Sequence, residues 1–342
     1  MDKQKKATGA GIFFLVLIGV HMILELVVGL FNDYIHFEDL PMGANILISQ
    51  SLIILPVIGY FIVTKQNVLE TIRFRKMHIG SLFLVIPLTY CMYPLLICVN
   101  AISMAFSNNM IAETMTGVTS SFPYIAALSM LALLPAIVEE TTFRGIMLNG
   151  FHRDSNPWPA ILFSALCFGA MHLNFNQFSY AFVLGVVMGI TLEASGSILA
   201  TMLIHFLYNG TSTTLMYLLP KLMQWSTETL EASGEVSQDQ LDQILGASST
   251  ANIEPWQMIA VGGMMLPFAA VGLVLAWFIW YAIAKLNHRE LIFKGMFSRK
   301  TEAQKQAMKA DKVKIMTVFL WIALAICLAY MILVEIMARI PS

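Results

Sequence analysis

Charged residues are scarce in this 342-residue chain: Asp, Glu, Lys and Arg make up 12% of it, against 58% hydrophobic residues. A soluble domain carries about a quarter charged residues, so this composition excludes an ordinary water-soluble fold. Cysteine is also scarce, and the four present lie in apolar stretches, where we expect packing and neither disulfides nor a metal site. The chain has no internal repeat, Gly-rich phosphate-binding loop or zinc-finger spacing, and nothing predicts nucleic-acid binding.

Long apolar stretches, in contrast, recur along the whole sequence at the length of transmembrane helices. We predict an all-α polytopic bundle of eight to nine spans that forms a single membrane domain over residues 1–342. The first stretch is too long for the apolar part of a signal peptide and counts as a span. Gly185 and Gly189 predict close packing of the sixth span. The nine spans are expected at roughly 10–31, 44–64, 79–101, 121–143, 157–174, 177–193, 196–219, 256–284 and 313–338.

Basic residues are distributed unevenly between the predicted loops. With the N-terminus in the cytoplasm and nine spans, every Lys and Arg except Lys221 and Arg339 falls on the cytoplasmic side. We therefore predict a cytoplasmic N-terminus and an extracytoplasmic acidic loop over 220–255, with a short helix around Asp239 to Leu245. The segment 285–312 is predicted as a cytoplasmic basic loop that sets the topology and contacts anionic lipid headgroups.

A few polar residues interrupt the apolar stretches, where a membrane makes them costly unless they find partners inside the protein. Glu139 and Glu140 lie near the end of the fourth predicted span, and Arg144 follows. Glu140 and Arg144 are four residues apart and can pair on one helix face, whereas Glu139 points about 100° away. The alternative is a helix end with solvated acids, but residues 141–151 continue the helix with mostly apolar side chains.

Two later spans carry histidines. His172 follows Phe168 by four residues, and His205 precedes Asn209 by four, so each pair shares a helix face. A lone histidine is often structural, and polar side chains also hold membrane helices together. The three spans nevertheless bring these groups to similar depths from the cytoplasmic side, so we expect one shared polar site. Glu193, by contrast, is expected to be solvated at a cytoplasmic turn.

The ordered motifs E-E-x-x-x-R, F-x-x-x-H and H-x-x-x-N resemble those of the CAAX protease and bacteriocin-processing family. This family, also called Abi, includes the type II CAAX prenyl endopeptidases. The resemblance covers roughly residues 120–215, which we interpret as a catalytic core. It implies an intramembrane endopeptidase in which Glu139 and His172 activate a water molecule, while His205 and Asn209 stabilise the oxyanion. It gives supporting roles to Glu140, Arg144 and Phe168.

A metal-dependent mechanism is left open beside the glutamate-dependent one. Two histidines and a carboxylate form a familiar zinc set with one position open to water. Glu139, His172 and His205 could supply such a set and bind a divalent cation such as zinc. No other cofactor is expected.

Two other classes of function compete with the protease. The same polar residues could serve a transporter or an ion- or proton-coupled protein, but no inverted repeats or broken helices are found. A non-catalytic scaffold of the same family is the other alternative, and the intact motifs argue against it. We expect a peptide or membrane-protein substrate, prenylated or not, and a place in the lipid bilayer of a bacterial cytoplasmic (inner) membrane.

Overall fold

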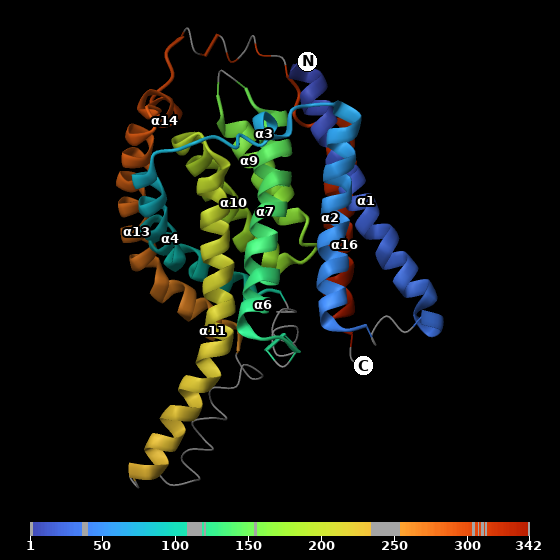
Figure 1. Ribbon diagram of the computed structural model, residues 1–342, viewed down its shortest axis with the longest axis vertical. Helices are drawn as coiled ribbons and strands as arrows, with labels where there is room; N and C mark the ends of the chain where they lie inside the picture. The colour runs from blue at the N-terminus through green and yellow to red at the C-terminus, as the bar shows by residue number, and fades with distance from the viewer. Residues whose placement is uncertain are drawn as a thin grey trace.

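In a computed structural model of the chain, long helices run side by side between the two ends of a bundle (Figure 1). The structure describes residues 3–35, 40–107, 118–119, 121–153, 156–233, 254–302, 305–306, 308, 311 and 313–340. Within these ranges every regular element is a helix and no strand occurs, so the prediction of an all-α fold is confirmed.

The elements follow one another in the order expected from the apolar stretches. The fourth predicted span is built from five consecutive pieces, two of them π-helical and labelled η. In chain order the elements are α1 (Lys3–Ile35), α2 (Met42–Thr64), α3 (Val68–Thr71), α4 (Ile79–Met104), α6 (Tyr124–Leu128), η2 (Ser129–Leu133), α7 (Leu134–Glu140), η3 (Thr141–Met147), α8 (Leu148–Phe151), α9 (Trp158–Ala170), α10 (Phe175–Ser195), α11 (Ile198–Ser233), α13 (Pro255–Leu286), α14 (Glu290–Phe297) and α16 (Val318–Met337).

Seven helices in the described part of the chain are long and apolar enough to cross a membrane, so the prediction of nine was wrong. The two remaining predicted spans do form helices, but α9 has only 13 residues. α11 is long, yet polar residues such as His205 and Asn209 leave it less apolar than the seven. α9 packs against α10, and α11 packs against α4 and α7. Helices that protein covers need less apolar surface than helices that lipid surrounds.

Part of the predicted extracytoplasmic loop continues a helix. α11 runs on to Ser233 with Pro220 inside it, and extends beyond the other helices at the end opposite the N-terminus (Figure 1). The short helix predicted over Asp239 to Leu245 lies outside the described residues. The two termini lie at opposite ends of the bundle (Figure 1), which agrees with an odd number of crossings. Which end faces the cytoplasm stays a prediction.

The predicted basic loop 285–312 also contains a helix. α14 begins shortly after α13 ends and buries Phe293 and Met296. It lies at the end of the bundle that carries the N-terminus (Figure 1). The basic segment and the N-terminus are therefore on the same side, as the distribution of charge predicted.

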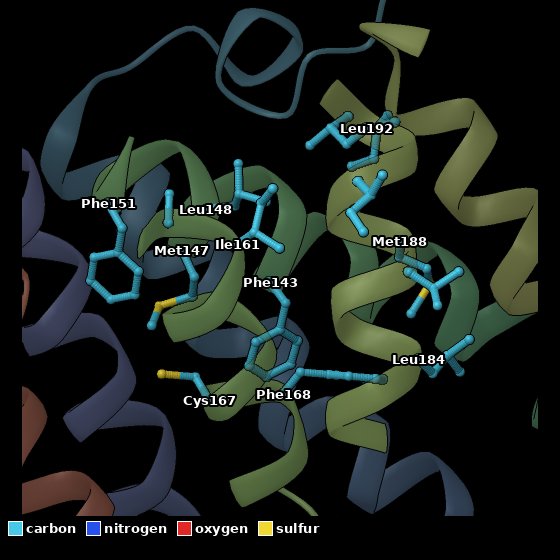
Figure 2. Packing of buried hydrophobic residues seen from close by; sticks show 14 of the residues in the cluster. Phe143, Met147, Leu148, Phe151, Ile161, Cys167, Phe168, Leu184, Met188 and Leu192 are labelled. Carbon is cyan, nitrogen blue, oxygen red and sulfur yellow. The ribbon is translucent and has the colours of Figure 1, made fainter. Parts of the chain in front are cut away.

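The core that positions the polar site is formed by η3, α8, α9 and α10 (Figure 2). Leu184, Met188 and Leu192 are spaced four residues apart, so they form one buried stripe along α10. Phe143 of η3 and Phe168 of α9 meet edge to face, with ring centroids 5.2 Å apart. These contacts hold the helix that carries Arg144 against the helix that leads to His172.

Two glycines allow α9 and α10 to approach this closely. A Cβ added at Gly185 would lie 2.8 Å from Cβ of Ala165 and 3.3 Å from Nη2 of Arg144. A Cβ added at Gly189 would lie 2.7 Å from Cγ2 of Ile161. The close packing predicted for this glycine pair is confirmed.

Candidate active site

Glu139 and Glu140 end the short helix α7, which lies between two π-helical segments, η2 and η3. Such segments are rare and occur frequently at functional sites, because the extra residue re-aims the side chains that follow. Pro135 stands in the first turn of α7 and has no backbone N–H. The helix is therefore irregular on both sides of the two glutamates.

Glu140 and Arg144 form a fully buried ion pair, with 2.8 Å between Oε1 and Nη1. The pairing predicted from their spacing is confirmed. The guanidinium also lies over the ring of Phe168, with Cζ 4.4 Å from the ring centroid, a cation–π contact. Glu140 Oε2 and the Arg144 atoms Nε and Nη2 bond to no described residue. This charge pair can exist in the interior only because each member neutralises the other.

His205 joins the two adjacent glutamates. Its Nδ1 lies 3.0 Å from Oε1 of Glu140, and because a carboxylate in this pair only accepts, Nδ1 carries the proton and donates. Its Nε2 lies 3.7 Å from Oε2 of Glu139, which is beyond hydrogen-bond length. Both glutamates and His205 are buried. The bond between Glu140 and His205 was missed by the sequence analysis, since spacing along one helix says nothing about a residue 65 positions away.

His172 lies in the turn between α9 and α10, at the edge of this group. Its ring meets the ring of Phe168 at a centroid distance of 5.4 Å, and the same phenyl ring is 5.7 Å from His205. Phe168 thus contacts both imidazoles, which explains the F-x-x-x-H spacing. The side chain of His172 forms no hydrogen bond with the part of the chain that the structure describes, and Glu139 is in contact with His205 and not with His172.

Asn209 binds the helix that carries the glutamates. Its Nδ2 donates to the backbone carbonyl oxygen of Leu131 at 3.2 Å. In a regular α-helix that carbonyl would accept from the N–H of residue 135, but Pro135 has none. Leu131 lies in the π-helical segment η2, so the amide binds α11 to an irregular part of the helix that carries the glutamates, and it retains a second N–H.

The zinc set considered from the sequence, Glu139, His172 and His205, stays a prediction. Among the residues that the structure describes, no group of three or more His, Cys, Asp or Glu side chains is placed to hold a metal ion. Nδ1 of His205 is bound to Glu140, so its Nε2 is the nitrogen that faces Glu139.

Glu193 differs from its expected setting. It is buried near the end of α10, and two arginines bind it: Arg73 at 2.6 Å and Arg289 at 3.1 Å. The expectation of a solvated turn residue was wrong, because the cations come from segments distant in sequence.

Residues 121–211 match a family described as type II CAAX prenyl endopeptidase Rce1-like. No curated protein and no solved structure matches the chain. The matched range contains every residue of the three motifs, from Glu139 to Asn209. With its seven apolar helices, the chain is an integral membrane protein. Over residues 121–211 it is similar to the Rce1-like type II CAAX prenyl endopeptidases, which is consistent with the CAAX protease and bacteriocin-processing family.

Proposed function

We propose that the chain is an intramembrane endopeptidase that hydrolyses a peptide bond at the site formed by Glu139, Glu140 and His205. The observation that carries this proposal is the buried contact between Oε2 of Glu139 and Nε2 of His205 at 3.7 Å. The opposite ring nitrogen of His205 is bound by Glu140. A carboxylate and an oriented imidazole at this distance can both reach a water molecule and the carbonyl that it attacks.

In the first step Glu139 acts as general base. The water oxygen attacks the carbonyl carbon of the substrate and its proton passes to the Glu139 carboxylate. His172 assists from the neighbouring turn, because its ring nitrogens bond to no described residue and can hold the water. The proton then passes to the leaving nitrogen as the carbon–nitrogen bond breaks, which yields a carboxylic acid and an amine.

The oxyanion that forms on the attacked carbonyl needs donors that are oriented before the reaction. Glu140 accepts from Nδ1 of His205 and orients the ring, so that its protonated form would present an N–H at Nε2. Asn209 has a second amide N–H beyond the one bound to Leu131. Arg144 keeps Glu140 ionised and in place. The roles that the family resemblance implies are thus chemically consistent with these positions.

The test is cleavage by the full chain in proteoliposomes, using a panel of quenched fluorescent peptides with and without a C-terminal prenyl group. Glu139→Gln is expected to abolish cleavage, since an amide takes up no proton. Glu25→Gln, which removes an exposed acid on α1, is the matched control and should retain wild-type rates. Equal activity of Glu139→Gln and wild type would overturn the proposal.

Two further arms decide the mechanism and substrate. If a chelator abolishes cleavage and zinc restores it, a metal carries the reaction and the glutamate-dependent mechanism is wrong. Cleavage confined to prenylated peptides would identify a prenylated tail as the substrate. Proton-coupled flux in vesicles without cleavage would favour the transporter.

A further inference from the structure

A cluster of arginines surrounds Glu193 at the end of the bundle that carries the N-terminus. Arg73 follows α3, and its Nη1 lies 2.6 Å from Oε1 of Glu193. Arg289 precedes α14, and its Nη2 lies 3.1 Å from Oε2, while its Nε donates to the backbone oxygen of Glu193 at 2.6 Å. Figure 1 shows α3 and α14 at this same end. One buried carboxylate thus binds two guanidinium groups from distant segments.

The cluster carries more positive charge than Glu193 neutralises. Arg75 is the third guanidinium of what we call the arginine triad, Arg73, Arg75 and Arg289. Burial lowers the pKa of Arg289, Glu193 opposes that shift, and the like charges of Arg73 and Arg75 add to it. His152 also faces the cluster, with Nδ1 3.3 Å from Nη2 of Arg73. Arg73 and Arg289 thus share the carboxylate of Glu193, and Arg75 adds a further positive charge.

Some donors of the triad are not used within the protein. Nε of Arg73 and Nη1 of Arg289 bond to no described residue, and neither is shielded from the surface. A planar guanidinium with spare N–H groups binds phosphate oxygens in a fork geometry. The triad thus has both the charge and the donors for a phosphate.

Large apolar side chains are exposed beside the triad. Leu69 is 57% exposed, Phe74 between two of the arginines is 47% exposed, and Leu291, two residues after Arg289, is 81% exposed. Apolar side chains alternating with cations are typical of protein surfaces at the boundary between acyl chains and headgroups. This setting favours a phosphate that is attached to a lipid over one free in solution.

We propose that the arginine triad binds the phosphate of an anionic phospholipid, whose acyl chains contact Leu69, Phe74 and Leu291. The triad is tied to the beginning of α11, the helix that carries His205. Ile198 N–H donates to the carbonyl of Arg73 at 3.1 Å, and the hydroxyl of Ser197 donates to the carbonyl of Arg75 at 2.6 Å. A bound lipid therefore stabilises the folded bundle, because it binds only where these segments meet.

The experiment is thermal unfolding of the full chain in detergent, titrated with short-chain phosphatidylglycerol, with phosphatidylcholine and with inorganic phosphate. Only phosphatidylglycerol is expected to raise Tm in a saturable manner. Arg75→Gln should weaken its apparent affinity about tenfold, since one charge-assisted contact is lost. Arg75 is exposed and does not pair with Glu193, so this variant should fold.

The matched control is Lys76→Gln, which removes the neighbouring exposed cation. It should retain the wild-type affinity. If the two variants weaken the apparent affinity for phosphatidylglycerol equally, the lipid is held by diffuse attraction between charges and not by a defined site. This result would overturn the proposal. An equal rise in Tm with phosphatidylcholine, or with inorganic phosphate alone, would also overturn it. The rise in Tm does not depend on peptide cleavage. Failure of the lipid proposal can therefore be distinguished from failure of the proposed protease activity.

Discussion

At the scale of single residues, Glu140 determines the geometry of the site although it is not the proposed base. Its Oε1 accepts from both Arg144 and His205, at 2.8 and 3.0 Å. Two cationic or proton-donating groups on one oxygen keep the carboxylate ionised and fix the imidazole tautomer. Glu139 has only the more distant Nε2 of His205 beside it. Two adjacent glutamates thus have different environments, one structural and one suited to proton transfer.

The first prediction concerns this ion pair. Arg144→Met should lower the free energy of unfolding by about 3 kcal/mol, because it leaves a buried carboxylate without its cation. Adding Glu140→Gln should cost much less than the sum of the two single changes, since the uncompensated charge is gone. Chemical unfolding in detergent measures all three variants.

The matched control is Arg339→Met, which breaks an ion pair of the same spacing and the same 2.8 Å distance with the half-buried Glu335. The Arg339 side chain is exposed and also donates to the backbone carbonyl of Phe106. The effect of this substitution should stay below about 1 kcal/mol, because solvent already screens a pair whose arginine is exposed. Additive losses for Arg144→Met and Glu140→Gln would show that the two side chains do not depend on each other.

At the scale of elements, the site depends on how closely α9 and α10 pack against η3. Gly185 of α10 faces Ala165 of α9 and the guanidinium of Arg144 at once. The aromatic contact of Phe143 with Phe168 holds the same three elements together (Figure 2). A change in the distance between α9 and α10 would therefore displace Arg144 and disturb its ion pair with Glu140.

The second prediction follows from that spacing. Gly185→Ala should destabilise the protein by about 1–3 kcal/mol, because its Cβ would overlap Ala165 and press on Arg144. It should also lower the rate of peptide cleavage. Gly263→Ala in α13 is the control: nothing lies within 4 Å of its added Cβ. That variant should be neutral or more stable, by up to about 1 kcal/mol, since alanine favours helix. Equal stability of the two variants would contradict the packing argument.

At the scale of the whole molecule, the bundle has two chemically different ends. The N-terminus, α3 and α14 lie at one end, and α11 extends from the other (Figure 1). The basic residues around Glu193 belong to the first end. The positive-inside rule assigns that end to the cytoplasm.

The third prediction tests this orientation by labelling with a membrane-impermeant maleimide. Thr229→Cys, exposed near the far end of α11, should react in intact cells. Ser298→Cys, exposed just after α14, should react only after the membrane is permeabilised. The native cysteines are buried or half-buried and should label weakly. The reverse pattern of labelling would invert the predicted topology.

Features that depend on neighbours along one helix could be predicted from the sequence alone. Apolar length predicted the helical membrane bundle, and the four-residue spacing of Glu140 and Arg144 predicted their ion pair. The glycine spacing likewise predicted close packing of α10. Each of these follows from the pitch of a helix and the solvent around it, and needs no knowledge of the partner helix.

Which helix faces meet is visible only in the folded bundle. The bond of Glu140 to His205, the contact of Asn209 with Leu131 and the burial of Glu193 between two arginines all join segments far apart in the chain. The number of spans also depended on it, since α9 is short and packs against α10, and α11 is less apolar than the seven candidate spans among the described residues. The rotation and crossing of packed helices are determined by all their side chains together, so hydropathy and spacing do not contain them.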